Sequence, residues 1–460
     1  MGTTPATAGP RRSGTTKAFA LLTIGATALT CSLVTAQSTV AATSFPHVAF
    51  KLHPASEGHI NATARTAPIS TSDCVAQIGI HCYSPLQYRN AYDLNPLYQQ
   101  GITGKGRTIV IVDSFGSPTI QHDLETFDQQ WGIQDTQVQV VKWGNVPAFD
   151  PTNSDMTGWA GETTLDVEYA HSIAPDAHIV LVETGVAETE GVTGLPEMMD
   201  AEKSLINKGV GDVITQSFGA TENTFPGFDK GDFKSLTDLR YAFKSAAAHD
   251  VTVLASSGDN GVTDSDNSNN LYPFKVNSWP SSDPLVTSVG GTQLTLDNAG
   301  NRTSPDAVWH DAYGAGGGGV SGIFDRPWYQ TGVANVVGNH RGTPDISMSA
   351  AVDGAAWTYE SYDPTRVGWH LTGGTSEASP IFSGVVALAD QAAGHRLGQL
   401  NWRMYGLKFL PSQWSGINDV TVGDNGWNNV TGYQAGAGYT LAAGLGTVDG
   451  YKFVHALAGR

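Results

Sequence analysis

Cysteine and basic residues are scarce in this sequence, and their scarcity excludes several classes of protein. The 460 residues include 3 Cys, too few for a small domain held together by disulfides. Only 25 Lys and Arg stand against 43 Asp and Glu, which gives a formal net charge of −18. Nucleic acids and anionic membranes are bound through clusters of Lys and Arg, so neither is expected as a partner. A hydrophobic fraction of 40% also excludes a disordered chain.

Long apolar runs are also rare, and the one that could span a bilayer lies near the N-terminus. Three basic residues between positions 11 and 17 precede an uncharged stretch from 18 to 36, which ends in Val34-Thr35-Ala36. Basic residues, an apolar run and a cleavage site of small residues are typical of a secretory signal. We therefore expect residues 1–36 to be a signal peptide and the protein to be secreted and extracellular. A membrane anchor is the alternative.

Export makes the two remaining cysteines informative. Cys74 and Cys82 are expected to form a disulfide in an oxidising compartment, close to the entry to the main domain. Residues 37–83 mix Ser, Thr, Ala and Pro, and we interpret them as a short propeptide or an N-terminal arm. Residues 84–460 show no internal repeat and no long linker, which predicts one domain.

Apolar strands alternate with helices throughout that domain. Strands are expected at 108–113, 177–183, 212–217 and 251–256, and helices at 162–173, 196–208, 236–249 and 376–393. Continuous apolar strands that alternate with helices predict an α/β fold with a mainly parallel sheet covered on both faces. Chemistry in such sheets lies at the carboxyl ends of the strands, where Asp113 and Asp259 are found.

A nucleophilic serine is indicated by the string Gly373-Gly-Thr-Ser-Glu-Ala-Ser-Pro380, which precedes a helix rich in small residues. Ser376 would lie at the helix N-terminus, where the dipole and free N–H groups favour a developing anion. Pro380 is tolerated in the first turn of a helix. A plain helix N-cap is the alternative role for Ser376.

The base that such a serine needs is not a histidine of the subtilisin type, because none of the 13 His residues is followed by Gly. Glu162 and Asp166 are instead four residues apart, so on a helix they share one face and can share a proton. A solvated helix face is the alternative for this pair taken alone. Asp259, in the loop after the last expected strand, could donate a hydrogen bond to an oxyanion if it is protonated. A turn residue beside Gly is its alternative role.

Together these strings resemble the sedolisin family of serine-carboxyl peptidases, which are relatives of subtilisin. The resemblance extends from about Cys82 to the C-terminus and includes further strings: Tyr83–Tyr92, Trp279–Thr292, Gly316–Ser321 and Gly342–Ile346. It implies a subtilisin-like three-layer α/β fold. It also implies that Ser376 is the nucleophile, Glu162 the general base, Asp166 its supporting carboxylate and Asp259 the oxyanion-hole acid.

Two further roles follow from the same resemblance. Asp113 would extend the proton network as an auxiliary carboxylate, or only cap the end of its strand. The Gly-rich string is similar to the strand that lines the primary substrate pocket, which assigns substrate binding to Gly317, Gly318, Gly319 and Ser321. A flexible loop is the alternative for this string.

The resemblance also implies one calcium ion near the C-terminus. Asp419 and the carbonyl of Val420 match one half of the family's site, and the carbonyls of Gly436 and Gly438 match the other half. Thr440 stands where the family has a second Asp ligand, and Asp424 could substitute for it. A site with one carboxylate should bind calcium weakly, because the number of charged ligands tunes affinity.

The expected function is therefore that of a secreted, monomeric peptidase that is active in acid and hydrolyses peptides or proteins. A subtilisin-like peptidase active at neutral pH, and an inactive secreted binding protein on the same scaffold, are the alternatives. Internal cleavage and removal of N-terminal tripeptides both stay open. The family's propeptide is of domain size, whereas residues 37–83 are too few for a folded inhibitory domain, so we expect either that the mature enzyme folds without one or that something else controls it.

Overall fold

The computed structural model describes residues 64–460 together with Gly2. Apart from Gly2, the predicted signal peptide lies outside the described residues, as does the first part of the predicted propeptide or arm. Residues 64–83 pack against the domain: helix α1 spans Thr71–Gln77, and strand β1 (Cys82–Tyr83) pairs in parallel with β14 (Ala355–Glu360). A disulfide joins Cys74 to Cys82 and so links α1 to β1.

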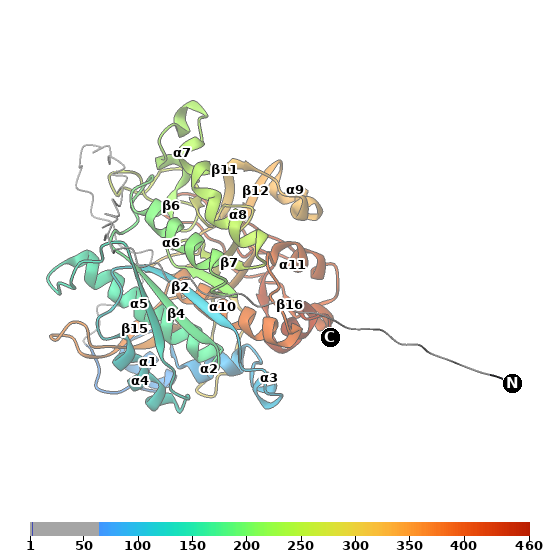
Figure 1. Ribbon diagram of the computed structural model, residues 1–460. Coiled ribbons are helices and arrows are strands. Elements are labelled where there is room, and N and C mark those ends of the chain that lie inside the picture. The colour runs from blue at the N-terminus through green and yellow to red at the C-terminus, as the bar shows by residue number, and fades with distance from the viewer. Residues whose placement is uncertain (1, 3–63) are drawn as a thin grey trace. The chain divides into compact units, whose positions relative to one another are not determined.

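An eight-stranded sheet forms the centre of the domain (Figure 1). Its path runs β10-β9-β7-β5-β2-β4-β3, and β13 pairs with β9 outside this path. Every pairing is parallel except that of β10 with β9. The strands span Thr108–Ser114 (β2), Val138–Trp143 (β3), His178–Thr184 (β4), Val213–Gln216 (β5), Thr252–Ser256 (β7), Thr287–Gln293 (β9), Ala307–Val308 (β10) and Ile346–Ser349 (β13).

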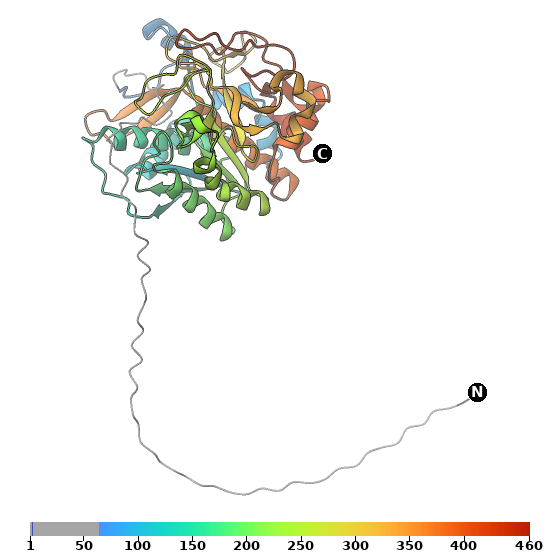
Figure 2. The same cartoon turned by 90° about the horizontal axis from the view of Figure 1, so that it is seen from above.

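Helices cover both faces of this sheet. Alternate residues of β2 enter different hydrophobic clusters: Ile109 and Ile111 pack with α5 (Ser154–Ile173) and α10 (Thr375–Ala393), whereas Val110 and Val112 pack with α6 and α8. Helices α6 (Leu195–Asn207) and α8 (Tyr241–Ala248) belong to the green segments along one side of the domain in Figure 2. The predicted α/β class with a mainly parallel, doubly covered sheet is therefore confirmed.

The remaining elements surround this core. Two antiparallel pairs lie next to the site described below, β14 with β15 (Gly368–Thr372) and β11 (Gly319–Asp325) with β12 (His340–Thr343). Smaller strands are β6 (Ala220–Thr221), β8 (Ser278–Trp279), β16 (Ile417–Asn418) and β17 (Thr447–Val448). The other helices are α2 (Pro85–Ala91), α3 (Asn95–Gln99), α4 (Ile120–Trp131), α7 (Lys234–Thr237), α9 (Ala334–Val337), α11 (Asn401–Leu407), α12 (Ser412–Ser415) and α13 (Gly450–Leu457). Within residues 64–460, none of the helices combines the length and the apolar character that crossing a membrane would require.

We expect the fold to be most stable in acid, because several of its carboxyl groups are buried. Burial raises the pKa of Glu202 and Glu377 to about 8, and that of Glu222 and Asp390 to about 7. A carboxyl whose pKa is higher in the folded than in the unfolded chain favours folding most at low pH, and this contribution is lost as pH rises through the folded-state pKa. We expect the melting temperature to fall between about pH 4.5 and pH 8, a window set by these pKa values. Calorimetry across that range tests this expectation.

A matched variant makes the test specific. Glu202 lies on α6, where Gln216 donates a hydrogen bond to it, and it is fully buried. Glu202→Gln removes the ionisation but keeps the shape, so it should flatten the decline in melting temperature above pH 6. A melting temperature that stays constant or rises between pH 5 and pH 8 would contradict the assignment.

Candidate active site

The carboxyl ends of three neighbouring strands bring polar residues to one edge of the sheet. Asp113 is near the end of β2, Ser217 follows β5 directly, and Asp259 lies in the loop after β7. These strands are adjacent in the order β7-β5-β2, and both pairings, β7 with β5 and β5 with β2, are parallel. The edge is therefore the place where an open α/β sheet positions its chemistry.

Helix α5 places two carboxylates above this edge. It begins after Asn153, whose side chain accepts hydrogen bonds from the N–H groups of Asp155 and Met156. Glu162 and Asp166 lie one turn apart on the helix, and both are fully buried. The Ser217 hydroxyl donates to Asp166 Oδ1 over 2.9 Å, which connects the helix to the end of β5.

The three carboxyl groups Asp113, Glu162 and Asp166 influence each other electrostatically. Burial raises the pKa of Asp113 well above its usual range, and the nearby charge of Glu162 raises it further. Burial also raises the pKa of Asp166, with smaller contributions from Asp113 and Glu162, against the lowering effect of the Ser217 hydrogen bond. Asp113 and Asp166 therefore hold their protons in acid, which reduces the repulsion against a negative charge on Glu162.

Ser376 is the second residue of α10 and is fully buried. The chain enters this helix from β15 of the β14–β15 hairpin. Helices α5 and α10 pack closely. A Cβ atom at position 384 would lie only 2.5 Å from the Cβ atom of Ile173, so this contact requires Gly384. The Ser256 hydroxyl donates to the Thr375 carbonyl over 2.9 Å, which holds the start of α10 at the end of β7.

Asp259 is held against the same helix terminus. Its Oδ1 atom accepts hydrogen bonds from the backbone N–H of Thr375 at 2.8 Å and from the Thr375 hydroxyl at 2.7 Å. Its Oδ2 atom lies beside Gly374, where the Cβ of any other residue would come within 2.6 Å of it. Gly374 also has φ +123°, which other residues rarely adopt. The sequence Gly374-Thr375-Ser376 thus fixes an acid next to the candidate nucleophile.

The Gly-rich segment borders the loop that carries Asp259. The Gly317 N–H donates to the Gly258 carbonyl at 2.7 Å, and the Ser257 hydroxyl donates to the Gly317 carbonyl at 2.8 Å. A Cβ on Gly317 would lie 2.1 Å from the Ser257 carbonyl oxygen, so this contact requires Gly. The carbonyls of Gly318 and Gly319 accept from the side chains of Asn425 and Thr343. These hydrogen bonds fix the conformation of the segment beside the site.

Glu222 accepts hydrogen bonds from β11, the strand that follows the Gly-rich segment. Ser321 donates its hydroxyl to Glu222 at 2.6 Å, and the N–H of Gly322 donates to the same carboxyl at 2.7 Å. Glu222 is 1% exposed. Ser321 is therefore a structural link between β11 and Glu222, and its predicted contact with substrate stays a prediction.

The structure thus brings Glu162, Asp166, Asp113, Asp259 and Ser376 to one edge of the sheet, with Gly317–Gly319 next to the Asp259 loop. Sequence reasoning missed Ser217, Thr375 and Glu222. Ser217 ends an expected strand at the functional edge, so its position offered a usable indication. Thr375 lies inside the Ser376 string, but its contact with Asp259 spans 116 positions and could not be foreseen.

The predicted calcium ligands lie in a region where a lysine already neutralises the one carboxylate. The Lys408 ammonium contacts the Asp419 carboxylate and donates to the Leu445 carbonyl at 2.7 Å. The Val420 carbonyl accepts from the N–H of Gly436, and Thr440 accepts from the N–H of Ala443. Among residues 64–460, no three or more His, Cys, Asp or Glu side chains gather around one point, so any calcium ion here would depend on backbone carbonyls. This donor set does not fit calcium, because a site with its charge already paired attracts a divalent cation poorly.

The response to a chelator follows from this arrangement. We expect the melting temperature to be the same, within about 1 °C, with calcium and with an excess of EDTA, because Lys408 supplies the positive charge at Asp419. Melts of the dialysed protein in both buffers test this. A fall of several degrees in EDTA would show instead that calcium binds, with Asp419, Val420, Gly436 and Gly438 as its ligands.

A serine at a helix N-terminus, with buried carboxyl groups at the same edge of a mainly parallel sheet, is an arrangement typical of a serine-type hydrolase on a subtilisin-like sheet. The sequence model of the Subtilase family matches residues 153–433. The chain is 30% identical over 425 residues to kumamolisin of Bacillus sp. (strain MN-32), covering 90% of this chain and 68% of that protein. It is 31% identical over 378 residues to sedolisin of Pseudomonas sp. (strain 101), covering 80% and 60%.

A solved structure agrees with these relatives. The fold is similar to that of Pseudomonas sedolisin complexed with two molecules of pseudo-iodotyrostatin, with a TM-score of 0.68 and 27% identity, covering 83% of this chain and 99% of that one. The chain belongs to the sedolisin family of subtilisin-like, serine-type peptidases. It spans 60 to 68% of the length of the two curated relatives named above.

Proposed function

We propose that this protein is a secreted peptidase, active in acid, that hydrolyses peptide bonds through an acyl-enzyme on Ser376, with Glu162 as general base. The observation that carries the proposal is the group of carboxyl residues around the start of α10. Burial raises the pKa of Asp113 and Asp166, and Asp259 is hydrogen-bonded to Thr375. Secretion rests on the basic and apolar pattern of residues 11–36.

The first chemical step is attack of the Ser376 hydroxyl on a peptide carbonyl. Glu162 accepts the hydroxyl proton, and the protonated neighbours Asp113 and Asp166 lower the electrostatic cost of a negative charge at Glu162. Asp166 acts through Glu162, and the Ser217 hydrogen bond fixes its orientation. Ser376 is the nucleophile because its place at the helix start lets the free N–H groups stabilise negative charge.

Asp259 stabilises the oxyanion that forms in this step. Because its Oδ1 accepts two hydrogen bonds from Thr375, a proton on the carboxyl resides on Oδ2, beside Gly374. A protonated Oδ2 donates to the oxyanion together with the Ser376 N–H, and one such donor contributes about a hundredfold or more to the rate. Glu162 then protonates the leaving amine, and water releases the acyl group from Ser376.

This chemistry requires acid. Glu162 must be ionised and Asp259 protonated at the same time, and the ordinary pKa of a carboxyl group is about 4. We expect kcat/KM for an internally quenched peptide to be highest below about pH 5 and to fall steeply towards pH 7. Initial rates between pH 2 and pH 8, with circular dichroism as a check that the protein stays folded, test the proposal. A maximum between pH 7 and pH 8 would indicate a neutral subtilisin-like mechanism instead.

A further inference from the structure

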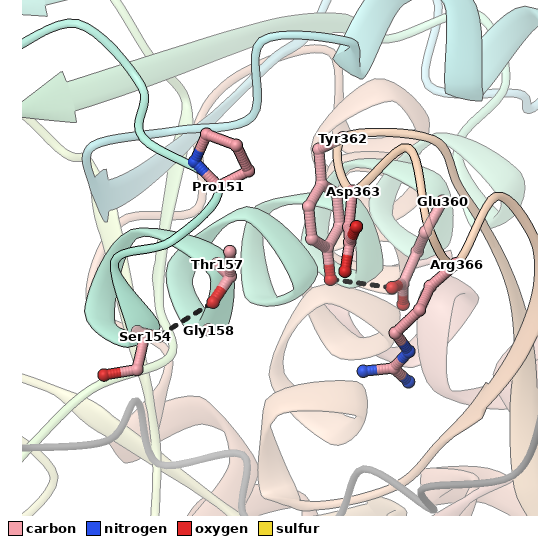
Figure 3. Close-up of a pocket in the computed structure, with 8 residues that line it drawn as sticks. All are labelled: Pro151, Ser154, Thr157, Gly158, Glu360, Tyr362, Asp363 and Arg366. Atoms are coloured by element: carbon pink, nitrogen blue, oxygen red, sulfur yellow. Dashed lines mark hydrogen bonds between the residues drawn. The ribbon is translucent and has the colours of Figure 1, made fainter.

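A cavity of about 240 Å³ lies at the start of α5 (Figure 3). One wall is the first turn and a half of the helix, with Ser154, Thr157 and Gly158. The opposite wall is the end of β14 and the loop that leads to β15, with Glu360, Tyr362, Asp363 and Arg366; Pro151 completes the lining. The cavity therefore lies between the helix that carries Glu162 and the hairpin that leads to Ser376.

The position of the cavity along α5 relates it to the reacting bond. Gly158 and Ser154 are one and about two turns before Glu162, which is about 6 and 12 Å along the helix axis. An extended peptide advances about 3.4 Å per residue. The cavity can therefore receive a side chain or chain end about two to four residues away from the scissile bond.

The side of the scissile bond follows from the proposed mechanism. Glu162 protonates the leaving amine, so the first residue of the leaving part lies beside α5. Strand β11, which follows the Gly-rich segment, lies on another side of α5: in Figure 1, β11 is above α5, whereas β15 is below it. The cavity thus belongs to the side of the leaving group.

The charged groups in the cavity differ in how far they are already paired. Glu360 is 5% exposed and accepts from the Tyr362 hydroxyl at 2.7 Å and from the Thr358 hydroxyl at 3.2 Å. Asp363 accepts from the N–H and the hydroxyl of Thr365, and these bonds, followed by the charge of Arg366, lower its pKa. Both carboxylates therefore have donors of their own.

Arg366 is the cation that is left for a ligand. Its guanidinium makes no hydrogen bond or ion pair with any other residue of the 64–460 segment, and the side chain is drawn beside Glu360 at the lower edge of the cavity in Figure 3. A guanidinium presents a planar fork of donors that matches a carboxylate. Ser154 and Thr157 line the opposite side of the cavity, where the Thr157 hydroxyl donates to the Ser154 carbonyl.

We propose that this cavity is a leaving-side subsite in which Arg366 binds a carboxylate of the substrate. The proposal rests on the proposed peptidase function and names a substrate class for it. The carboxylate can come from an Asp or Glu side chain or from the C-terminus of the substrate. The negative charges of Glu360 and Asp363 repel a bound carboxylate. We therefore expect Arg366 to raise kcat/KM for the acidic substrate only as much as an exposed ion pair would, about fivefold.

Two pairs of peptides with one common cleavage site test the subsite and separate these sources. The first pair has Glu or Gln at the third residue after the scissile bond, within a longer amidated peptide. The second pair ends at that residue, as a free acid or as an amide. Rates are measured at pH 5, where a glutamate side chain is mostly ionised. We expect the wild type to prefer the acidic member of one pair about fivefold, and that pair identifies the source.

Arg366→Gln should reduce this preference to about one. The matched control is Arg403→Gln on α11, where the guanidinium stacks on Trp402 far along the chain from the cavity, and it should keep the wild-type preference. An unchanged preference in Arg366→Gln, or a wild type without preference in either pair, would overturn the subsite alone. A wild type that cleaves no peptide at any pH would overturn the proposed function, and the subsite with it.

Discussion

Replacement of Ser376 by Ala should lower kcat/KM by about ten-thousandfold or more. The substitution removes the one oxygen that can form the acyl-enzyme, and the other active-site groups alone give only a small residual rate. Because Ser376 is fully buried and Ala is a good helix former, the fold should be retained. Hydrolysis of an internally quenched peptide at pH 4, over long incubations, measures the loss.

Ser383→Ala is the matched control for this variant. Ser383 lies on the same helix, is equally buried, and donates its hydroxyl to the Pro380 carbonyl of its own helix. It should retain activity near the wild-type level. If Ser376→Ala kept a tenth or more of the wild-type activity, the nucleophile would have to be another residue.

Replacement of Glu162 by Gln should lower kcat/KM by about a thousandfold, because the amide cannot accept the proton of Ser376. The activity that remains should no longer depend on the ionisation of this group, so the acidic limb of the pH profile should disappear or move. The fold should tolerate the change, because a neutral side chain of the same shape replaces a buried ionisable one.

Glu168→Gln on the same helix is the control for Glu162→Gln. Glu168 is also fully buried, and burial raises its pKa, but it accepts hydrogen bonds from the N–H of Tyr359 on β14. Its replacement should leave kcat and the pH profile close to those of the wild type. Equal losses in the two variants would mean that buried charge on α5, and not a base at Glu162, accounts for the effect.

The central sheet could be predicted from the sequence because its strands are continuous apolar runs. The runs expected at 108–113 and 177–183 correspond to β2 (Thr108–Ser114) and β4 (His178–Thr184) within one residue at each end. Helix α5 begins eight residues before the expected start, at Ser154, because Asn153 caps it. Strand β9 was not expected, since Gly290 and Gly291 at its centre carry no strand preference and are fixed by contacts with Pro344 and Ala350.

The candidate site was predictable as far as residue types in short strings allow. Ser376, Glu162 and Asp259 each belong to a string that suggests a role, and the sheet places them at one edge. Contacts between distant segments were not predictable: Ser217 with Asp166, Glu222 with Ser321, and Lys408 with Asp419. The last of these contacts bears on the calcium prediction. Lys408, at the C-terminal end of α11, contacts the carboxylate that the family resemblance assigns to calcium.

The acid excess of the composition also acquires a physical meaning. Several of the carboxyl groups are buried with raised pKa values, so they are neutral in acid and favour the folded state there. The same property that the proposed mechanism needs at Asp113 and Asp166 therefore occurs throughout the core. Activity and stability should both be greatest in acid.

Digestion of a peptide library, analysed by mass spectrometry at pH 4 and at pH 8, shows whether Ser376 supports peptide hydrolysis in acid. Wild-type protein and Ser376→Ala are compared at both values. We expect many cleaved peptides at pH 4 with the wild type, few at pH 8, and none above background with Ser376→Ala. More cleavage at pH 8 than at pH 4, or cleavage by Ser376→Ala at the wild-type level, would contradict this expectation.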